Sequence, residues 1–113
     1  AVAEGIRDFV AAVISYVPDA WNSEVVRSPS YILRRVRERG FAYGDCDDMA
    51  TLAAALALAA GLPARYVLVG FHGGPWEHVY TEILTAGGWL EVDPSRPEGW
   101  SSAPTDRREA VSV

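Results

Sequence analysis

The side chains of this sequence that could do chemistry are one cysteine, two histidines and an aspartate that follows an apolar run. Cys46 is the only cysteine, and a cysteine thiolate is a strong nucleophile. A nucleophilic thiol needs a base that takes up its proton and a third group that orients this base. His78 and Asp93 come later in the chain and carry side chains suited to these two roles. The three residues are therefore the first candidates for an active site.

Each candidate also has a purely structural interpretation. A lone cysteine is often a small buried apolar residue, and an aspartate before proline, as in Asp93-Pro94, often forms a turn. A zinc site made of Cys46, His72, His78 and Asp93 is disfavoured because no pair of these ligands has the close spacing of zinc sites. A calcium loop of the EF-hand type would need a glycine and a distal glutamate that the sequence lacks. We expect neither a metal nor a cofactor.

The thiol would be positioned by an apolar helix from Cys46 to Ala60. Apolar residues occupy nearly every face of this helix, so we expect it to be buried on all sides. Asp45 and Asp48 form an imperfect capping box at its start, and Gly61 marks its end. A thiol in the first turn of a helix meets free N–H groups and the positive end of the helix dipole, which favour the thiolate.

Three acidic residues oppose this effect. Asp45, Asp47 and Asp48 surround Cys46, and their negative charges disfavour a thiolate. The same residues have a structural explanation, because caps and first-turn acids stabilise the start of a helix. Activity would require the helix dipole and a protonated His78 to outweigh them.

The other elements are predicted from apolar periodicity and from turn residues. Two further helices should come first, and strands should follow the Cys46 helix. The predicted elements are an amphipathic helix Ala3–Val17, a loop Pro18–Ser30, a helix Ser30–Arg39 with Ser28 as its cap, a short loop Gly40–Gly44, strands Ala64–Phe71, Glu77–Ile83 and Gly88–Val92, and a last edge strand or frayed end at Glu109–Val113. Helices followed by an antiparallel sheet indicate an α+β fold. Arginines 34, 35, 37 and 39 of the second helix should form a solvated face.

The hairpin before Asp93 has two possible registers. A tight turn at Gly87-Gly88 would place Glu82 opposite Asp93 and leave His78 roughly 13 Å away along the strand. A four-residue loop from Leu84 to Gly87 would instead place His78 directly opposite Asp93. We predict the second register, because only it gives the imidazole an orienting partner.

The order of these motifs resembles the transglutaminase-like family of the papain-like cysteine enzymes. The likeness covers about half of the chain, in the segments Gly44-Asp45-Cys46-Asp47-Asp48, Gly61-Leu62-Pro63-Ala64-Arg65, His78-Val79-Tyr80-Thr81-Glu82 and Gly88-Trp89-Leu90-Glu91-Val92-Asp93-Pro94. It implies a papain-like minimal domain in which Cys46 is the nucleophile, His78 the general base and acid, and Asp93 the orienting group. It further implies acyl chemistry on an amide through a thioester, in a peptidase, an amidase or an acyltransferase.

The resemblance does not identify the second donor of an oxyanion hole, because no glutamine precedes Cys46. The backbone N–H of Cys46 would be the first donor. The side chains of Asn22, Trp21 or Tyr43 could supply the second. Trp21 and Trp76 lie in segments rich in turn residues, so we expect them to form the walls of a substrate cleft.

The composition restricts the partners. A chain of 113 residues, half of them hydrophobic, fits a single domain over residues 1–113, with N-terminal helices and loop (1–43), a catalytic helix and sheet (44–97) and a C-terminal loop or edge strand (98–113). The formal charge of −5 disfavours nucleic acid and anionic membranes as partners. The resemblance to the transglutaminase-like family implies a peptide or protein amide as substrate. A single cysteine and the lack of signal-peptide or membrane-spanning patterns favour a cytoplasmic protein. The alternative is a catalytically silent transglutaminase-like module that binds a partner or has a structural role.

Overall fold

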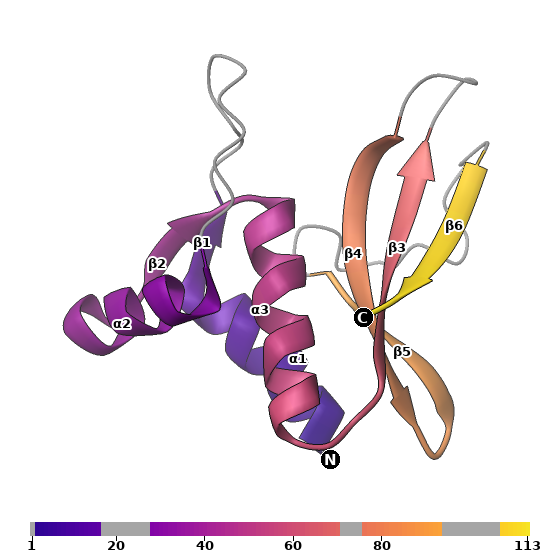
Figure 1. The fold of residues 1–113 in the computed structure, drawn as a ribbon. Coiled ribbons are helices and arrows are strands. Elements are labelled where there is room, and N and C mark those ends of the chain that lie inside the picture. The colour runs from indigo at the N-terminus through magenta and orange to yellow at the C-terminus, as the bar shows by residue number, and fades with distance from the viewer. Residues whose placement is uncertain (1, 17–27, 71–75, 94–106) are drawn as a thin grey trace.

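The computed structural model of the chain describes residues 2–16, 28–70, 76–93 and 107–113. Over these residues the elements are α1 (Val2–Val13), β1 (Ile14–Tyr16), α2 (Pro29–Arg39), β2 (Ala42–Gly44), α3 (Cys46–Ala59), β3 (Ala64–Gly70), β4 (Trp76–Thr85), β5 (Gly88–Val92) and β6 (Arg107–Ser112). The helices lie together beside an antiparallel sheet (Figure 1). The α+β class predicted from the order of the elements is confirmed.

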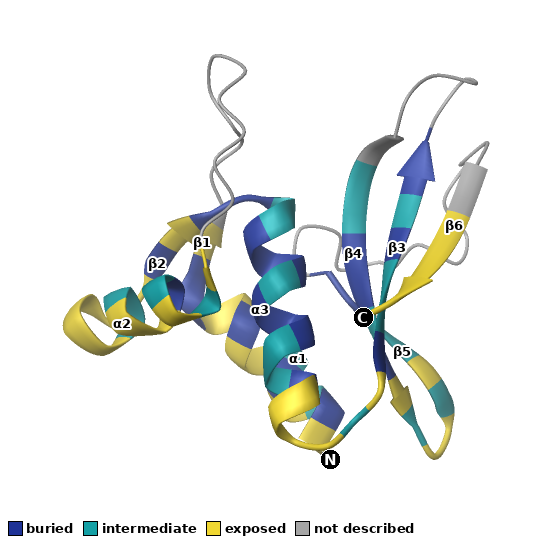
Figure 2. Ribbon diagram, viewed as in Figure 1, coloured by how far each residue is buried: buried dark blue, intermediate teal, exposed yellow. Residues whose placement is uncertain are grey.

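Helix α3 is the central element of the fold. It lies between the other two helices and the sheet, and it contacts α1, α2, β2, β3 and β4 (Figure 1). Leu52, Ala53 and Ala57 are fully buried (Figure 2). The prediction of burial on all sides is wrong at the C-terminal turn, because Leu58 is 49% exposed. The alanines of α3 let neighbouring elements approach closely, so the helix supports contacts on several faces.

Both ends of α3 are stabilised as the sequence predicts. Asp45 caps the N-terminus, and its carboxylate accepts a hydrogen bond from the backbone N–H of Asp48. At the other end Gly61 has φ +79°, which favours glycine. The N–H of Gly61 donates to the carbonyl of Leu58, and that of Leu62 to the carbonyl of Ala57. These two bonds form a Schellman motif and end the helix where strand β3 must begin.

The sheet has the strand order β5-β4-β3-β6, and all neighbouring strands are antiparallel. The predicted last edge strand is observed as β6, paired with β3. The main core lies between the sheet and the helices and includes Ile6, Val10, Leu52, Ile83 and Val92. A smaller buried cluster is formed by Val67, Val69 and Tyr80.

Two predictions for the N-terminal half are wrong. The first helix ends at Val13 rather than Val17, because residues 14–16 form strand β1. The predicted loop Gly40–Gly44 contains strand β2, which pairs with β1 in parallel. Ile14 and Ala42 are buried partners in this pair, so tertiary pairing overrides the local helical pattern. The second helix begins as predicted, since the Ser28 hydroxyl accepts from the N–H of Tyr31.

Neither predicted register of the hairpin is observed. Strands β4 and β5 close with Thr85 opposite Gly88, so the turn is Ala86-Gly87. The Thr85 hydroxyl donates to the carbonyl of Gly88 at 2.6 Å and accepts from the N–H of Gly87 at 3.2 Å. Gly88 takes the positive φ of +111°. The tight turn is therefore real, but it lies one residue earlier than Gly87-Gly88, and the four-residue loop is wrong.

No helix among the described residues is long and apolar enough to cross a membrane.

Candidate functional site

Cys46 is the first residue of α3, and its side chain is partly buried. Its Sγ lies 3.9 Å from Oδ1 of Asp47, which can accept a weak hydrogen bond from the thiol. The thiol thus lies at the positive end of the helix dipole with a carboxylate beside it. These two influences on the thiol have opposite signs, as the sequence predicts.

A buried pair of carboxylates fixes the start of the helix. The backbone N–H of Asp45 donates to Asp48 at 3.1 Å, and the N–H of Asp48 donates to Asp45 at 3.2 Å. Both side chains are buried, and Asp48 is completely so. Gly44 packs against this box, because a Cβ added there would lie 2.9 Å from Cβ of Asp48. The box holds the backbone on both sides of Cys46.

His78 and Asp93 are joined side chain to side chain. Nε2 of His78 lies 2.5 Å from Oδ2 of Asp93, and both side chains are largely buried. Asp93 directly follows β5, whose last pair is Thr81 with Val92. Continued by one residue, this register aligns Asp93 with Tyr80, so His78 is a diagonal neighbour two residues along the strand. Long side chains can bridge such a diagonal. The contact therefore forms without the register that we predicted for it.

His78 is also coupled to Cys46. Burial by itself lowers the pKa of His78, but hydrogen bonds with Asp93 and Cys46 raise it, and the charges of the same two groups raise it further. The net effect lifts the pKa of His78 from 6.5 to about 9. His78 is therefore an imidazolium at neutral pH. The structure brings Cys46, His78 and Asp93 together, from α3, β4 and the end of β5.

One contact that positions the site was missed from the sequence. The Thr81 hydroxyl is buried and donates to the backbone carbonyl of Ala50 at 2.7 Å. This bond ties β4 to α3 one turn beyond Cys46. A threonine in a strand, here between Tyr80 and Glu82, is compatible with many environments, so the sequence carried no signal for this partner.

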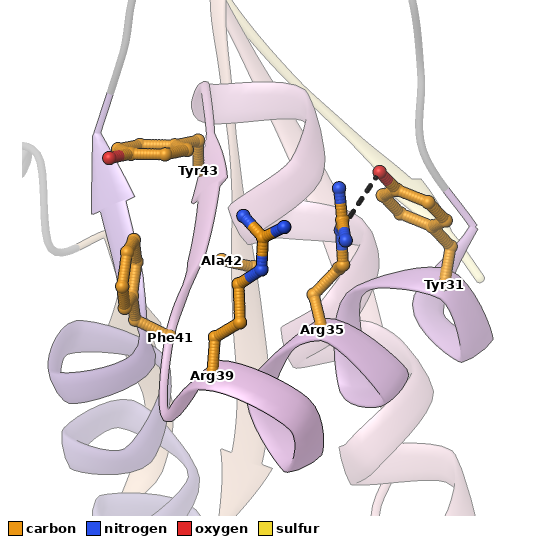
Figure 3. Close-up of a pocket in the computed structure, with 6 residues that line it drawn as sticks. All are labelled: Tyr31, Arg35, Arg39, Phe41, Ala42 and Tyr43. Atoms are coloured by element: carbon orange, nitrogen blue, oxygen red, sulfur yellow. Dashed lines mark hydrogen bonds between the residues drawn. The ribbon is translucent and has the colours of Figure 1, made fainter.

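The predicted oxyanion-hole and cleft residues are not part of the cluster of Cys46, His78 and Asp93 that the structure describes. Tyr43 is exposed on β2 and packs edge-on against Phe41, with ring centroids 5.1 Å apart. Both rings line a pocket between α2 and β2 (Figure 3). The residues that the structure describes do not include Asn22, Trp21 or His72, and they do not include the side chain of Trp76. The predicted cleft walls, Trp21 and Trp76, therefore lie outside the described part of the chain.

Within the parts of the chain that the structure describes, no three His, Cys, Asp or Glu side chains are arranged to hold a metal ion.

Residues 1–94 match the Transglutaminase-like superfamily. A search of curated proteins finds no significant match.

Solved structures of other proteins share the fold, among them the following three. A "putative protease" from Parabacteroides distasonis is 20% identical with a TM-score of 0.61, over 80% of this chain and 19% of that one. A "putative cysteine protease" from Cytophaga hutchinsonii is 22% identical with a TM-score of 0.57, over 98% and 44%. Calcium-bound LapG from Legionella pneumophila is 19% identical with a TM-score of 0.58, over 81% and 51%. This chain thus spans about half or less of the length of each of these proteins.

Proposed function

Because the chain belongs to the transglutaminase-like superfamily, we propose that it is the catalytic part of a cysteine enzyme that cleaves or transfers acyl groups from peptide amides. The observation that carries this proposal is the position of His78, which is hydrogen-bonded to Asp93 and coupled to Cys46 at the start of α3. The word protease in the names of two proteins of similar fold supports a peptide as substrate. A free thiol as nucleophile suits a reducing compartment such as the cytosol.

In the first step the Cys46 sulfur attacks the carbonyl carbon of the amide. His78 holds the proton that the thiol gives up, and Asp93 holds the ring by its Nε2, which leaves Nδ1 to serve the sulfur and the leaving group. The carbon–nitrogen bond breaks, the proton passes from His78 to the departing amine, and a thioester to Cys46 remains.

In the second step an acceptor attacks the thioester. His78 takes a proton from water or from an amine, the carbon–sulfur bond breaks, and the thiol of Cys46 is restored. Water gives a peptidase or amidase, and an amine gives an acyltransferase. The first oxyanion donor is the backbone N–H of Cys46, which the helix start leaves without an intrahelical acceptor. Asn22, Trp21 and Tyr43 stay candidates for the second.

The contact between Cys46 and Asp47 favours a second candidate, a silent binding module. A carboxylate 3.9 Å from the sulfur can accept a hydrogen bond from the thiol, and a thiol held in this way is a poor nucleophile. In that case the histidine and aspartate would serve only to stabilise the fold.

Thiol reactivity separates the two functions. An active site is expected to react with iodoacetamide at Cys46 at mildly acidic pH, and the His78→Gln variant to react at the rate of an ordinary thiol. Asp47→Asn serves as the matched control, since it removes the opposing charge and is expected to accelerate labelling. Slow labelling that falls steeply as the pH decreases, in both wild type and His78→Gln, would favour the silent module, because this is how an ordinary thiol behaves. Turnover of a peptide library, with and without an added primary amine, then identifies the acceptor.

A further inference from the structure

A second feature of the molecule is a pocket of about 230 Å³ between α2 and β2. Its lining consists of two arginines, three aromatic residues and an alanine: Tyr31, Arg35, Arg39, Phe41, Ala42 and Tyr43 (Figure 3). Among the residues that the structure describes, no carboxylate lines it. In Figure 3 the Arg39 side chain lies between the Phe41 and Tyr43 rings on one side and Arg35 with Tyr31 on the other. The arginine face that the sequence predicts to be solvated therefore contains a pocket.

The charges of this pocket are only partly compensated. Arg35 donates to the Tyr31 hydroxyl at 3.2 Å and lies over the Tyr31 ring, and its distance to Glu38 is 3.9 Å. Arg39 has no hydrogen-bond or ion-pair partner among the residues that the structure describes. Arg65 shows the opposite situation, since Glu82 binds it at 2.7 Å and the Trp89 ring lies 3.9 Å from its guanidinium carbon.

Arginine is concentrated here although the chain as a whole is acidic. Four of its arginines lie within the eleven residues of α2, which contain a single acidic residue, while the whole chain has a net charge of −5. Arg35 is also held in place by its bond to the Tyr31 hydroxyl, so its guanidinium fork loses little freedom when it binds an anion. A planar fork of this kind matches the two oxygens of a carboxylate.

The pocket also lies close to the proposed nucleophile along the chain. Tyr43 precedes Cys46 by three residues, so their Cα atoms are at most roughly 11 Å apart. An extended peptide advances about 3.3 Å per residue. A side chain about three residues from the amide at Cys46 can therefore reach the part of the pocket that Tyr43 lines.

We propose that this pocket binds an acidic side chain of a peptide substrate. The carboxylate lies between Arg35 and Arg39, and the Phe41 and Tyr43 rings support the adjoining part of the peptide. The role in substrate selection rests on the proposed function, whereas the binding itself does not. The site thus gives the enzyme a preference for acidic residues near the scissile amide.

The experiment uses an acetylated and amidated peptide with one glutamate among glycines, and its glutamine twin, titrated into the whole chain carrying Cys46→Ala. That variant binds without chemistry, and binding is followed by NMR chemical shifts. The glutamate peptide is expected to bind about two- to fivefold more tightly than the twin and to shift the signals of residues 39–43, in keeping with an exposed ion pair. Arg39→Gln and Arg35→Gln are each expected to remove most of this difference.

Arg37→Gln is the matched control, because it removes the same charge from the same helix at an exposed position outside the pocket. It is expected to keep the preference for glutamate. Equal binding of the two peptides, or an equal loss in Arg37→Gln, would overturn the proposal. The proposal would also be overturned if inorganic phosphate displaced both peptides and the glutamate peptide bound no more tightly than its twin, since the pocket would then be a phosphate site. If the wild-type chain binds the glutamate peptide in this way but neither cleaves amides nor transfers acyl groups, the proposed function alone would be overturned.

Discussion

At the scale of single residues, the proposed chemistry depends on Cys46. Cys46→Ala is expected to abolish amide cleavage or acyl transfer and to leave the fold intact, because the side chain is small and only partly buried. Cys46→Ser is also expected to be nearly inactive, since an imidazole does not hold a hydroxyl ionised as it does a thiol. Turnover and circular dichroism spectra of the two variants check this. Residual wild-type activity in Cys46→Ala would refute the role of the thiol.

His78 makes the stability of the fold depend on pH. Its pKa is raised from 6.5 to about 9 in the folded state, so the folded state binds the proton more tightly than the unfolded chain. The resulting stabilisation is complete below 6.5 and is lost as the pH rises through 9. It amounts to no more than about 3 kcal/mol, because solvent screens part of the interaction. Urea unfolding from about pH 6 to about pH 10 measures it.

The matched variant for this prediction is His78→Gln. It is expected to lose the fall in unfolding free energy over this range. A wild-type stability that rises with pH between 6.5 and 9 would contradict the assignment to His78.

At the scale of elements, the start of α3 is fixed by close packing around Gly44. A Cβ at this position would lie 2.9 Å from Cβ of Asp48 and 3.2 Å from Cγ2 of Ile14. Gly44→Ala is therefore expected to lower the free energy of unfolding by about 1–3 kcal/mol, as overpacking does. The site is expected to lose activity along with it, because the capping box positions Cys46.

Gly5→Ala is the control within the same chain. Gly5 lies in α1 with nothing within 4 Å of its would-be Cβ. Alanine there is expected to stabilise by about 0.5–1 kcal/mol, the ordinary gain of replacing a helical glycine. Thermal or urea unfolding of both variants compares them. Equal effects at the two positions would show that packing at Gly44 is loose.

The tie between β4 and α3 makes a separate prediction. Thr81→Val keeps the shape of the side chain but removes the bond to the Ala50 carbonyl, at a cost of about 0.5–1.5 kcal/mol. It is also expected to lower kcat, by up to about 100-fold if the site shifts by about 1 Å. Thr85→Val removes hairpin bonds far from the site and is expected to cost stability without lowering kcat. A normal kcat in Thr81→Val would show that the tie is only structural.

The sequence predicted the elements that have local signals and failed where the signal is long-range. The caps of α3 and α2 depend on residues within one turn, and the structure confirms them. Strands β1 and β2 form only by pairing with each other, and the residues near Ile14 and Ala42 carry no local signal for this pairing. The hairpin register depended on which glycine takes positive φ, and a side-chain hydroxyl of Thr85 decided it. The order of the motifs predicted that Cys46, His78 and Asp93 lie close together. It did not predict that His78 and Asp93 are diagonal neighbours across β4 and β5.

At the scale of the whole molecule, α3 supplies the core that the helices and the sheet share. Leu52 is completely buried there, and Leu52→Ala is expected to cost about 2–5 kcal/mol. Leu58 lies on the same helix but is 49% exposed, and Leu58→Ala is expected to cost less than about 1 kcal/mol. Urea unfolding measures both changes. Similar losses for the two variants would contradict the central position of α3.

The division of the site between α3 and the sheet has a consequence for protein synthesis. Cys46 precedes β3, β4 and β5 in the chain, so the ribosome releases the thiol before the strands that carry His78 and end at Asp93. Until those strands have emerged and packed on α3, the nascent thiol has no imidazole beside it. Contacts between distant segments form late in folding because loop closure must come first. Under the proposed function, the reactivity of Cys46 is therefore acquired only after translation has passed Asp93.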